Sequence, residues 1–119
     1  MEQRYWPICR YEDVRDPGSR EFALQIGERM INGFVIHWRG RWYAYRNSCP
    51  HTGVTLNWLP DQFFDPGLDY IQCSLHGALF QPHDGLCVYG PCLGRPLTSL
   101  PVLQQGDSIV LDSAGLRAG

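Results

Sequence analysis

The sequence lacks the features that mark membrane, secreted and nucleic-acid-binding chains. No run of about 18 apolar residues occurs, so we expect no membrane-spanning helix. Residues 1–7 contain no basic stretch followed by an apolar run, so we expect no secretory signal peptide. The formal net charge is −2 and no basic cluster is present, which argues against nucleic acid or an anionic membrane as a partner. These absences predict a cytoplasmic protein.

Helical periodicity is also scarce, and the chain is short. Residues 28–32 form the only segment with a helical tendency, and it is too short to define the fold. The 119 residues leave no room for a second catalytic domain of ordinary size. We therefore expect residues 1–119 to form one domain.

Short apolar and aromatic segments separated by turns are abundant. The chain contains 13 glycines and 9 prolines, which favour many turns. Alternating or β-branched segments predict strands, and Arg39-Gly40 and the run 82–85 predict hairpin turns between them. The predicted strands are 22–26, 33–38, 41–45, 70–72, 78–81, 86–89, 100–104 and 108–111. This pattern is typical of an all-β sandwich or barrel.

Five cysteines are present, and their odd number argues against a disulfide framework in a chain without a signal peptide. Two of them pair with histidines at short spacing, in Cys49-Pro50-His51 and in Cys73-Ser74-Leu75-His76. Two tight loops of this kind can direct two thiolates and two imidazoles toward one point. Such a set suits an iron–sulfur cluster or zinc. Zinc fingers place a Cys pair before a His pair, whereas each pair is mixed here, and this favours iron.

The segments CPHTG and CSLHG resemble the two ligand loops of the Rieske [2Fe–2S] family, and the resemblance covers about residues 20–112. It implies a Rieske-type β-sandwich or barrel with a small cluster-binding subdomain. The ligand loops would span about 47–57 and 71–80, and a proline loop about 90–92 would cover a third side. The resemblance further implies one [2Fe–2S] cluster. Cys49 and Cys73 would hold the inner iron, and His51 and His76 the outer iron.

Three positions depart from the high-potential branch of that family. Val54 and Leu75 stand where that branch has a pair of disulfide-bonded cysteines, and Ala78 stands where it has a serine that bonds a cluster sulfur. Fewer hydrogen bonds to sulfur leave the reduced cluster less stabilised. The resemblance is therefore to the low-potential, dioxygenase-ferredoxin-like branch.

The function implied by this resemblance is one-electron transfer from a flavin-dependent reductase to a terminal oxygenase, by a monomer. No catalytic residue is expected, because no nucleophile with a base and no carboxylate pair is evident. Two alternatives stay open. One is a small accessory subunit of a multisubunit oxidoreductase, similar to the nitrite reductase small subunit, and the other is a redox-sensing module.

The segment 52–72 between the ligand pairs is longer than in compact Rieske ferredoxins. Its Trp58, Phe63 and Phe64 either fold back over the cluster loop, which we favour, or form an apolar patch that docks a redox partner. Cys92 lies in the expected proline loop, where its thiol either packs or tunes the cluster. His37 and His83 are expected to be structural or surface residues rather than functional ones.

Overall fold

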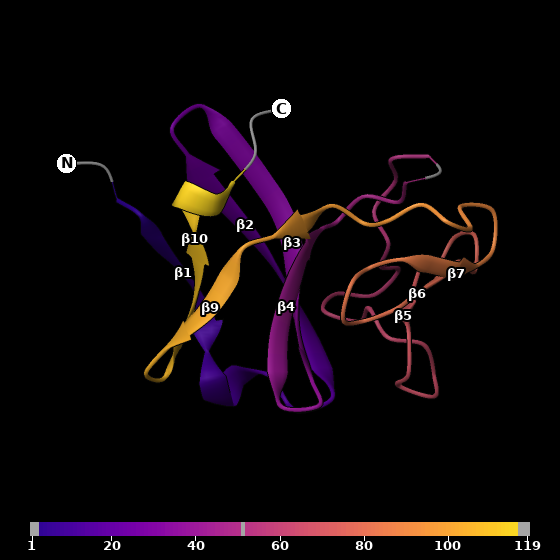
Figure 1. The fold of residues 1–119 in the computed structure, drawn as a ribbon, viewed down its shortest axis with the longest axis horizontal. Coiled ribbons are helices and arrows are strands. Elements are labelled where there is room, and N and C mark those ends of the chain that lie inside the picture. The colour runs from indigo at the N-terminus through magenta and orange to yellow at the C-terminus, as the bar shows by residue number, and fades with distance from the viewer. Residues whose placement is uncertain (1–2, 51, 117–119) are drawn as a thin grey trace.

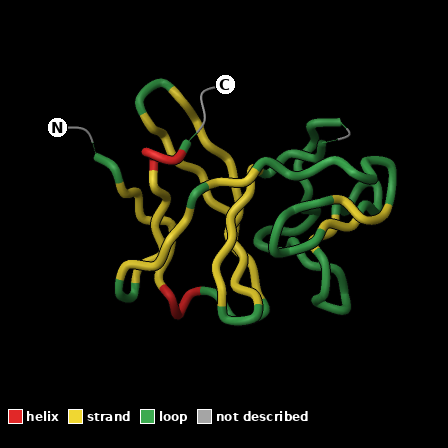
Figure 2. Tube along the Cα trace, viewed as in Figure 1, coloured by secondary structure: helices red, strands yellow, loops and turns green. Residues whose placement is uncertain are grey.

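The computed structural model describes residues 3–50 and 52–116. It has two parts, which lie side by side along the long axis of the molecule (Figure 1). We call residues 3–46 and 98–116 the base, because they form two antiparallel sheets. We call residues 47–97 the loop half, because most of this segment has no regular secondary structure (Figure 2).

The base consists of a three-stranded and a four-stranded sheet. In the first sheet β10 lies between β1 and β9, and in the second the order is β2-β3-β4-β8. All neighbouring strands are antiparallel. The strands of the base are β1 (Tyr5–Arg10), β2 (Gly18–Ile26), β3 (Arg29–Trp38), β4 (Arg41–Arg46), β8 (Ser99–Leu100), β9 (Val102–Gln105) and β10 (Ser108–Asp112).

Strand β3 connects the two halves of the molecule because both of its faces are buried. Side chains alternate between the faces of a strand. Ile31 and Val35 enter the core between the two sheets of the base. Phe34 and Ile36 enter a second core, which the base shares with the loop half. The ligand-bearing loops are therefore packed on a rigid sheet rather than on a linker.

The loop half contains a small three-stranded sheet formed by β5 (Ile71–Gln72), β6 (Leu79–Phe80) and β7 (Cys87–Tyr89). The helical content of the described chain is two short 3₁₀ turns, η1 (Tyr11–Asp13) and η2 (Ser113–Gly115). Within residues 3–50 and 52–116, no helix has the length and apolar character needed to cross a membrane.

The all-β prediction is confirmed, with local corrections. Residues 28–32, which have a helical tendency in the sequence, are not helical: β3 begins at Arg29, and Ile31 pairs with Leu24. Burial of Ile31 between the sheets outweighs the local preference. Strand β1 was missed because a register shift between Pro7 and Cys9 disrupts its alternation. The segment predicted as one strand over 100–104 is divided between β8 and β9.

Candidate metal centre

The first ligand loop is closed by two backbone hydrogen bonds around Cys49. The N–H of Cys49 donates to the carbonyl of Val54 at 2.7 Å, and the N–H of Gly53 donates to the carbonyl of Cys49 at 2.7 Å. Gly53 has a φ of 79°, a conformation that other residues adopt only with strain. The glycine of CPHTG therefore permits the turn that directs the Cys49 side chain inward.

The second ligand loop repeats this arrangement around Cys73. The N–H of Cys73 donates to the carbonyl of Ala78 at 2.9 Å, and the N–H of Gly77 donates to the carbonyl of Cys73 at 2.8 Å. Gly77 occupies the same place in its loop as Gly53 and has a φ of 70°. Two loops of different sequence thus have the same turn, with the cysteine at the same position in each.

Three of the four predicted ligands converge. The sulfur atoms of Cys49 and Cys73 and a ring nitrogen of His76 all lie within 4.8 Å of one another. The Sγ of Cys73 is 3.8 Å from Nδ1 of His76. Both cysteines are buried, whereas His76 is partly exposed. His51 lies outside the described residues.

The environment of Cys73 combines burial with hydrogen-bond donors. Burial raises the pKa of the Cys73 thiol, and the neighbouring Cys49 raises it further, whereas the backbone N–H groups of His76 and Leu75 oppose the shift. Two adjacent buried thiols become thiolates at little cost only when a cation neutralises them. The donor set of two thiols and an imidazole, with amides directed at sulfur, therefore fits an iron–sulfur centre.

Asn47 connects the first ligand loop to the base. Its N–H donates to the carbonyl of Asn32 in β3 at 3.0 Å. Its side-chain oxygen accepts from the N–H of Leu56 at 2.8 Å, and its amide nitrogen donates to Asn57 at 2.9 Å. The side chain of Asn47 thus connects the beginning of the segment 47–57 to its end.

The second ligand loop is hydrogen-bonded to the first. The N–H of Ser74 donates to the carbonyl of Leu56 at 2.8 Å, and the N–H of Trp58 donates to the Ser74 hydroxyl at 3.3 Å. These bonds set the distance between the two loops before any metal binds. The site is therefore partly preorganised by its own backbone.

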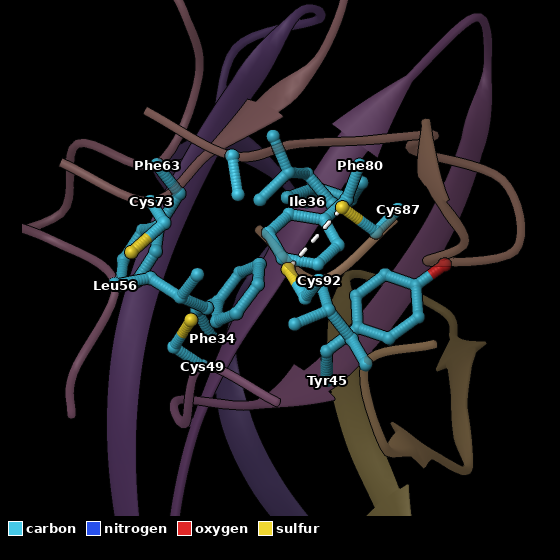
Figure 3. Packing of buried hydrophobic residues seen from close by; sticks show 13 residues of the cluster. Phe34, Ile36, Tyr45, Cys49, Leu56, Phe63, Cys73, Phe80, Cys87 and Cys92 are labelled. Carbon is cyan, nitrogen blue, oxygen red and sulfur yellow. Dashed lines mark hydrogen bonds between the residues drawn. The ribbon is translucent and has the colours of Figure 1, made fainter. Parts of the chain in front are cut away.

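The predicted proline loop lies against the second ligand loop. A Cβ atom on Gly90 would stand 2.8 Å from the Cα of Ala78, so glycine is needed for this approach. Cys92 follows two residues later and is buried, with its thiol donating to the Sγ of Cys87 at 3.2 Å (Figure 3). Sequence reasoning missed this contact, because nothing local to either cysteine indicates it.

The aromatic residues of the segment 52–72 differ in their burial. Phe63 is 1% exposed and stacks on Phe34, with ring centroids 4.1 Å apart, and Phe64 packs against the same core. Trp58 is 81% exposed. The prediction that these side chains fold back is confirmed for Phe63 and Phe64 and is wrong for Trp58. Trp58 instead forms part of the wall of a surface groove of about 550 Å³ beside the ligand loops.

The two remaining histidines lie away from this centre. His37 is buried in the base, where its ring stacks on Trp42 at 4.1 Å and its Nδ1 lies 3.3 Å from the carbonyl of Val14. His83 is exposed in the turn before β7. The buried position of His37 is consistent with a structural role, and His83 lies at the surface as expected.

The fold and the paired Cys–His loops define a Rieske-type iron–sulfur protein. A model of the Rieske [2Fe-2S] domain family matches residues 4–105, so the chain belongs to this family. The cofactor of this family is one Rieske [2Fe–2S] cluster, which the donor set described above fits. No curated protein sequence matches this chain significantly.

Solved structures share the fold at low sequence identity. In a complex of reduced oxygenase and oxidized ferredoxin in carbazole 1,9a-dioxygenase, the matched chain has a TM-score of 0.72 and 20% identity, with coverage of 94% of this chain and 95% of that one. The carbazole 1,9a-dioxygenase ferredoxin of Nocardioides aromaticivorans IC177 has a TM-score of 0.70 and 19% identity, with coverage of 92% and 98%. The terminal oxygenase of Novosphingobium sp. KA1 has a TM-score of 0.75 and 20% identity over 93% of this chain but 30% of its own.

Proposed function

We propose that this chain is a Rieske-type ferredoxin, a one-electron carrier between a flavin-dependent reductase and a terminal oxygenase. The observation that supports it best is the convergence of Cys49, Cys73 and His76, whose ligand atoms lie within 4.8 Å of one another. In the part of the chain that the structure describes, no other group of three His, Cys, Asp or Glu side chains converges in this way. The carrier would act as a cytoplasmic monomer, with residues 1–119 as one domain.

Cys49, His51, Cys73 and His76 would hold the cluster. When bound, the cluster supplies a one-electron redox couple. The polypeptide buries the two cysteines and leaves His76 partly exposed, so a partner protein can approach on the histidine side. Leu75, at the tip of the second loop, is 61% exposed and offers an apolar contact there.

The side chains around the centre support a reduction potential at the low end of the Rieske range. Ala78 is buried beside Cys73 and has no hydroxyl to offer a sulfur. Val54 and Leu75 cannot form a disulfide between the loops. Because donors to sulfur stabilise the reduced and more negative state, their scarcity lowers the potential. We expect a midpoint below about +100 mV, in a family range of about −150 to +300 mV.

The whole-length similarity to dioxygenase ferredoxins supports the choice of partners. The chain spans nearly the full length of the ferredoxin of carbazole 1,9a-dioxygenase but less than a third of a terminal oxygenase with the same fold. A free electron carrier would match a ferredoxin over its full length, as this chain does. The structure of an oxygenase together with a ferredoxin supports a terminal oxygenase as the acceptor.

Electron paramagnetic resonance of the dithionite-reduced protein tests this proposal. A rhombic signal of low average g, as nitrogen ligation gives, is the expected result, and titration of that signal yields the potential. Gel filtration of the natively purified protein should show a monomer that separates from other proteins. A colourless protein with stoichiometric zinc would overturn the proposal. Tight co-purification with a large oxidoreductase would favour an accessory subunit instead.

A further inference from the structure

Cys92 lies between two other sulfur atoms in the core of the loop half. Its Sγ donates to that of Cys87 at 3.2 Å, and Cys49 packs in the same buried core. Figure 3 shows the sulfur of Cys92 between those of Cys87 and Cys49. All three residues are at most 1% exposed, so water cannot replace these contacts. A buried thiol thus lies in the same core as one of the proposed cluster ligands and on the side that faces it.

The backbone holds the Cys92 side chain in this position. The carbonyl of Cys92 accepts from the N–H of Arg95 at 2.8 Å, and the adjacent Gly90 is packed against Ala78. The N–H of Gly94 donates to the carbonyl of Cys87 at 3.0 Å, which connects the turn to β7. Cys92 is therefore part of a fixed turn and not of an adaptable loop.

The Cys92 proton has two possible acceptors of unequal strength. Cys87 donates its own proton to the carbonyl of Tyr89 at 3.3 Å, so its sulfur is a neutral, weak acceptor. Cys49, once it binds a metal, is a thiolate, and hydrogen bonds to charged acceptors are roughly twice as strong as neutral ones. Because a thiol rotates about its C–S bond, a metal bound to Cys49 would favour turning the Cys92 proton from Cys87 toward Cys49.

We propose that the Cys92 thiol donates a hydrogen bond to the Sγ of Cys49 in the cluster-loaded protein and thereby raises its reduction potential. This inference rests on the proposed function, because it takes Cys49 to be a ligand. Reduction adds negative charge that is shared by the ligand sulfurs, so a donor to one of them stabilises the reduced state. Cys92 partly offsets the missing hydroxyl at Ala78.

The test compares potentiometric titrations of the wild type, Cys92→Ala and the matched control Cys87→Ala. Both cysteines are equally buried and each variant loses one sulfur, but the sulfur of Cys92 lies between those of Cys87 and Cys49 (Figure 3). For Cys92→Ala we expect the equilibrium constant for reduction to fall about threefold, a shift of about 30 mV at 59 mV per decade. For Cys87→Ala we expect no decrease. Equal shifts in both variants, or none in Cys92→Ala, would overturn the inference.

A second variant guards against loss of the cluster through misfolding of Cys92→Ala. Cys92→Ser keeps a proton donor at the same position and should leave the potential at or above that of the wild type. Resonance Raman spectroscopy should show a shift of the Fe–S(Cys) stretching bands in Cys92→Ala and not in Cys87→Ala. If Cys92→Ser instead has a lower potential than the wild type, hydrogen bonding is not the cause. Absence of a Rieske signal in the wild type would contradict the proposed function itself.

Discussion

The base and the loop half are stabilised in different ways, although one chain forms both. In the base, β2 and β3 are 9 and 10 residues long, and all of β2 pairs with residues 29–37 of β3. In the loop half, β5 and β6 have 2 residues each and β7 has 3. The loop half therefore depends on single hydrogen bonds from particular residues, such as Asn47 and Ser74, where the base has continuous ladders.

This difference has a consequence for metal binding. Cys49 and Cys73 belong to the hydrophobic core that the loop half shares with the base, together with Phe34 and Phe63. A bound cluster would thus complete the centre of that core, so metal binding and folding of the loop half are coupled. The core of the base contains no proposed ligand. The base should fold whether or not the cluster is present.

Replacement of a ligand should have the largest effect and should separate the two halves. We expect Cys73→Ser to lose iron and visible absorbance almost completely, because a serine hydroxyl is a hard and poorly ionised ligand. Circular dichroism should still report the β-structure of the base. Iron content per chain is the measurement, and Cys9→Ser, in β1 of the base, is the control that should keep full iron. Full iron in Cys73→Ser would contradict the assigned site.

Within the segment 52–72, two aromatic residues should differ in their effect on folding. Phe63→Ala should lower the free energy of unfolding by about 3–5 kcal/mol, because it leaves a cavity beside Phe34. Trp58→Ala should change it by about 0.5 kcal/mol or less, because the side chain is exposed. Denaturant unfolding measures both. Similar losses in the two variants would mean that Trp58 also packs.

The exposed Trp58 also provides a test of docking, because its variant should fold normally. If Trp58 contacts a redox partner, Trp58→Ala should slow electron delivery to a terminal oxygenase while the reduction potential stays unchanged. Stopped-flow kinetics with a dioxygenase as acceptor measures the rate. An unchanged rate would exclude Trp58 from the interface.

The glycine turns of the ligand loops should show a smaller effect. Gly77→Ala should destabilise the cluster-loaded protein by about 1–2 kcal/mol, because alanine is strained at a φ of 70° even though no atom lies within 4 Å of the added Cβ. Gly67→Ala is the control, since it lies outside the left-handed region and its Cβ would make only an ordinary contact of 3.4 Å with Asp69. Thermal unfolding followed at the cluster absorbance distinguishes them. Equal melting temperatures would show that the second turn tolerates a side chain.

The smallest expected effect is on the pH dependence of folding stability, and it concerns Cys9 in β1 of the base. Burial, followed by the charge of Asp13, raises the pKa of the Cys9 thiol from 9.0 to about 11. The unfolded chain therefore ionises at a lower pH than the folded one, and the wild type loses stability as pH rises from about 9 to about 11. Cys9→Ala lacks this loss, so its stability relative to the wild type should improve over that range. Urea unfolding at both ends of the range measures it, and a constant difference would contradict the shift.

Features that depend on neighbouring residues were predictable from the sequence. The hairpin of β3 and β4 was placed correctly because Arg39-Gly40 and the flanking β-branched and aromatic residues act locally. The convergence of Cys49, Cys73 and His76 was predictable because spacing within tight loops restricts where side chains point. The strand at residues 29–32 was not predicted, because the core that buries Ile31 comes from strands distant in sequence.

The class of fold and the convergence of Cys49, Cys73 and His76 followed from the amino-acid sequence, since alternation, turn residues and Cys–His spacing are local properties. The inward position of Phe63, the outward position of Trp58 and the contact between the thiols of Cys87 and Cys92 in the core of Cys49 arise only in the tertiary structure. These outcomes depend on which distant surfaces pack together. The base supplies that surface through Phe34 and Ile36, and no pattern within the segments 52–72 or 86–93 encodes it.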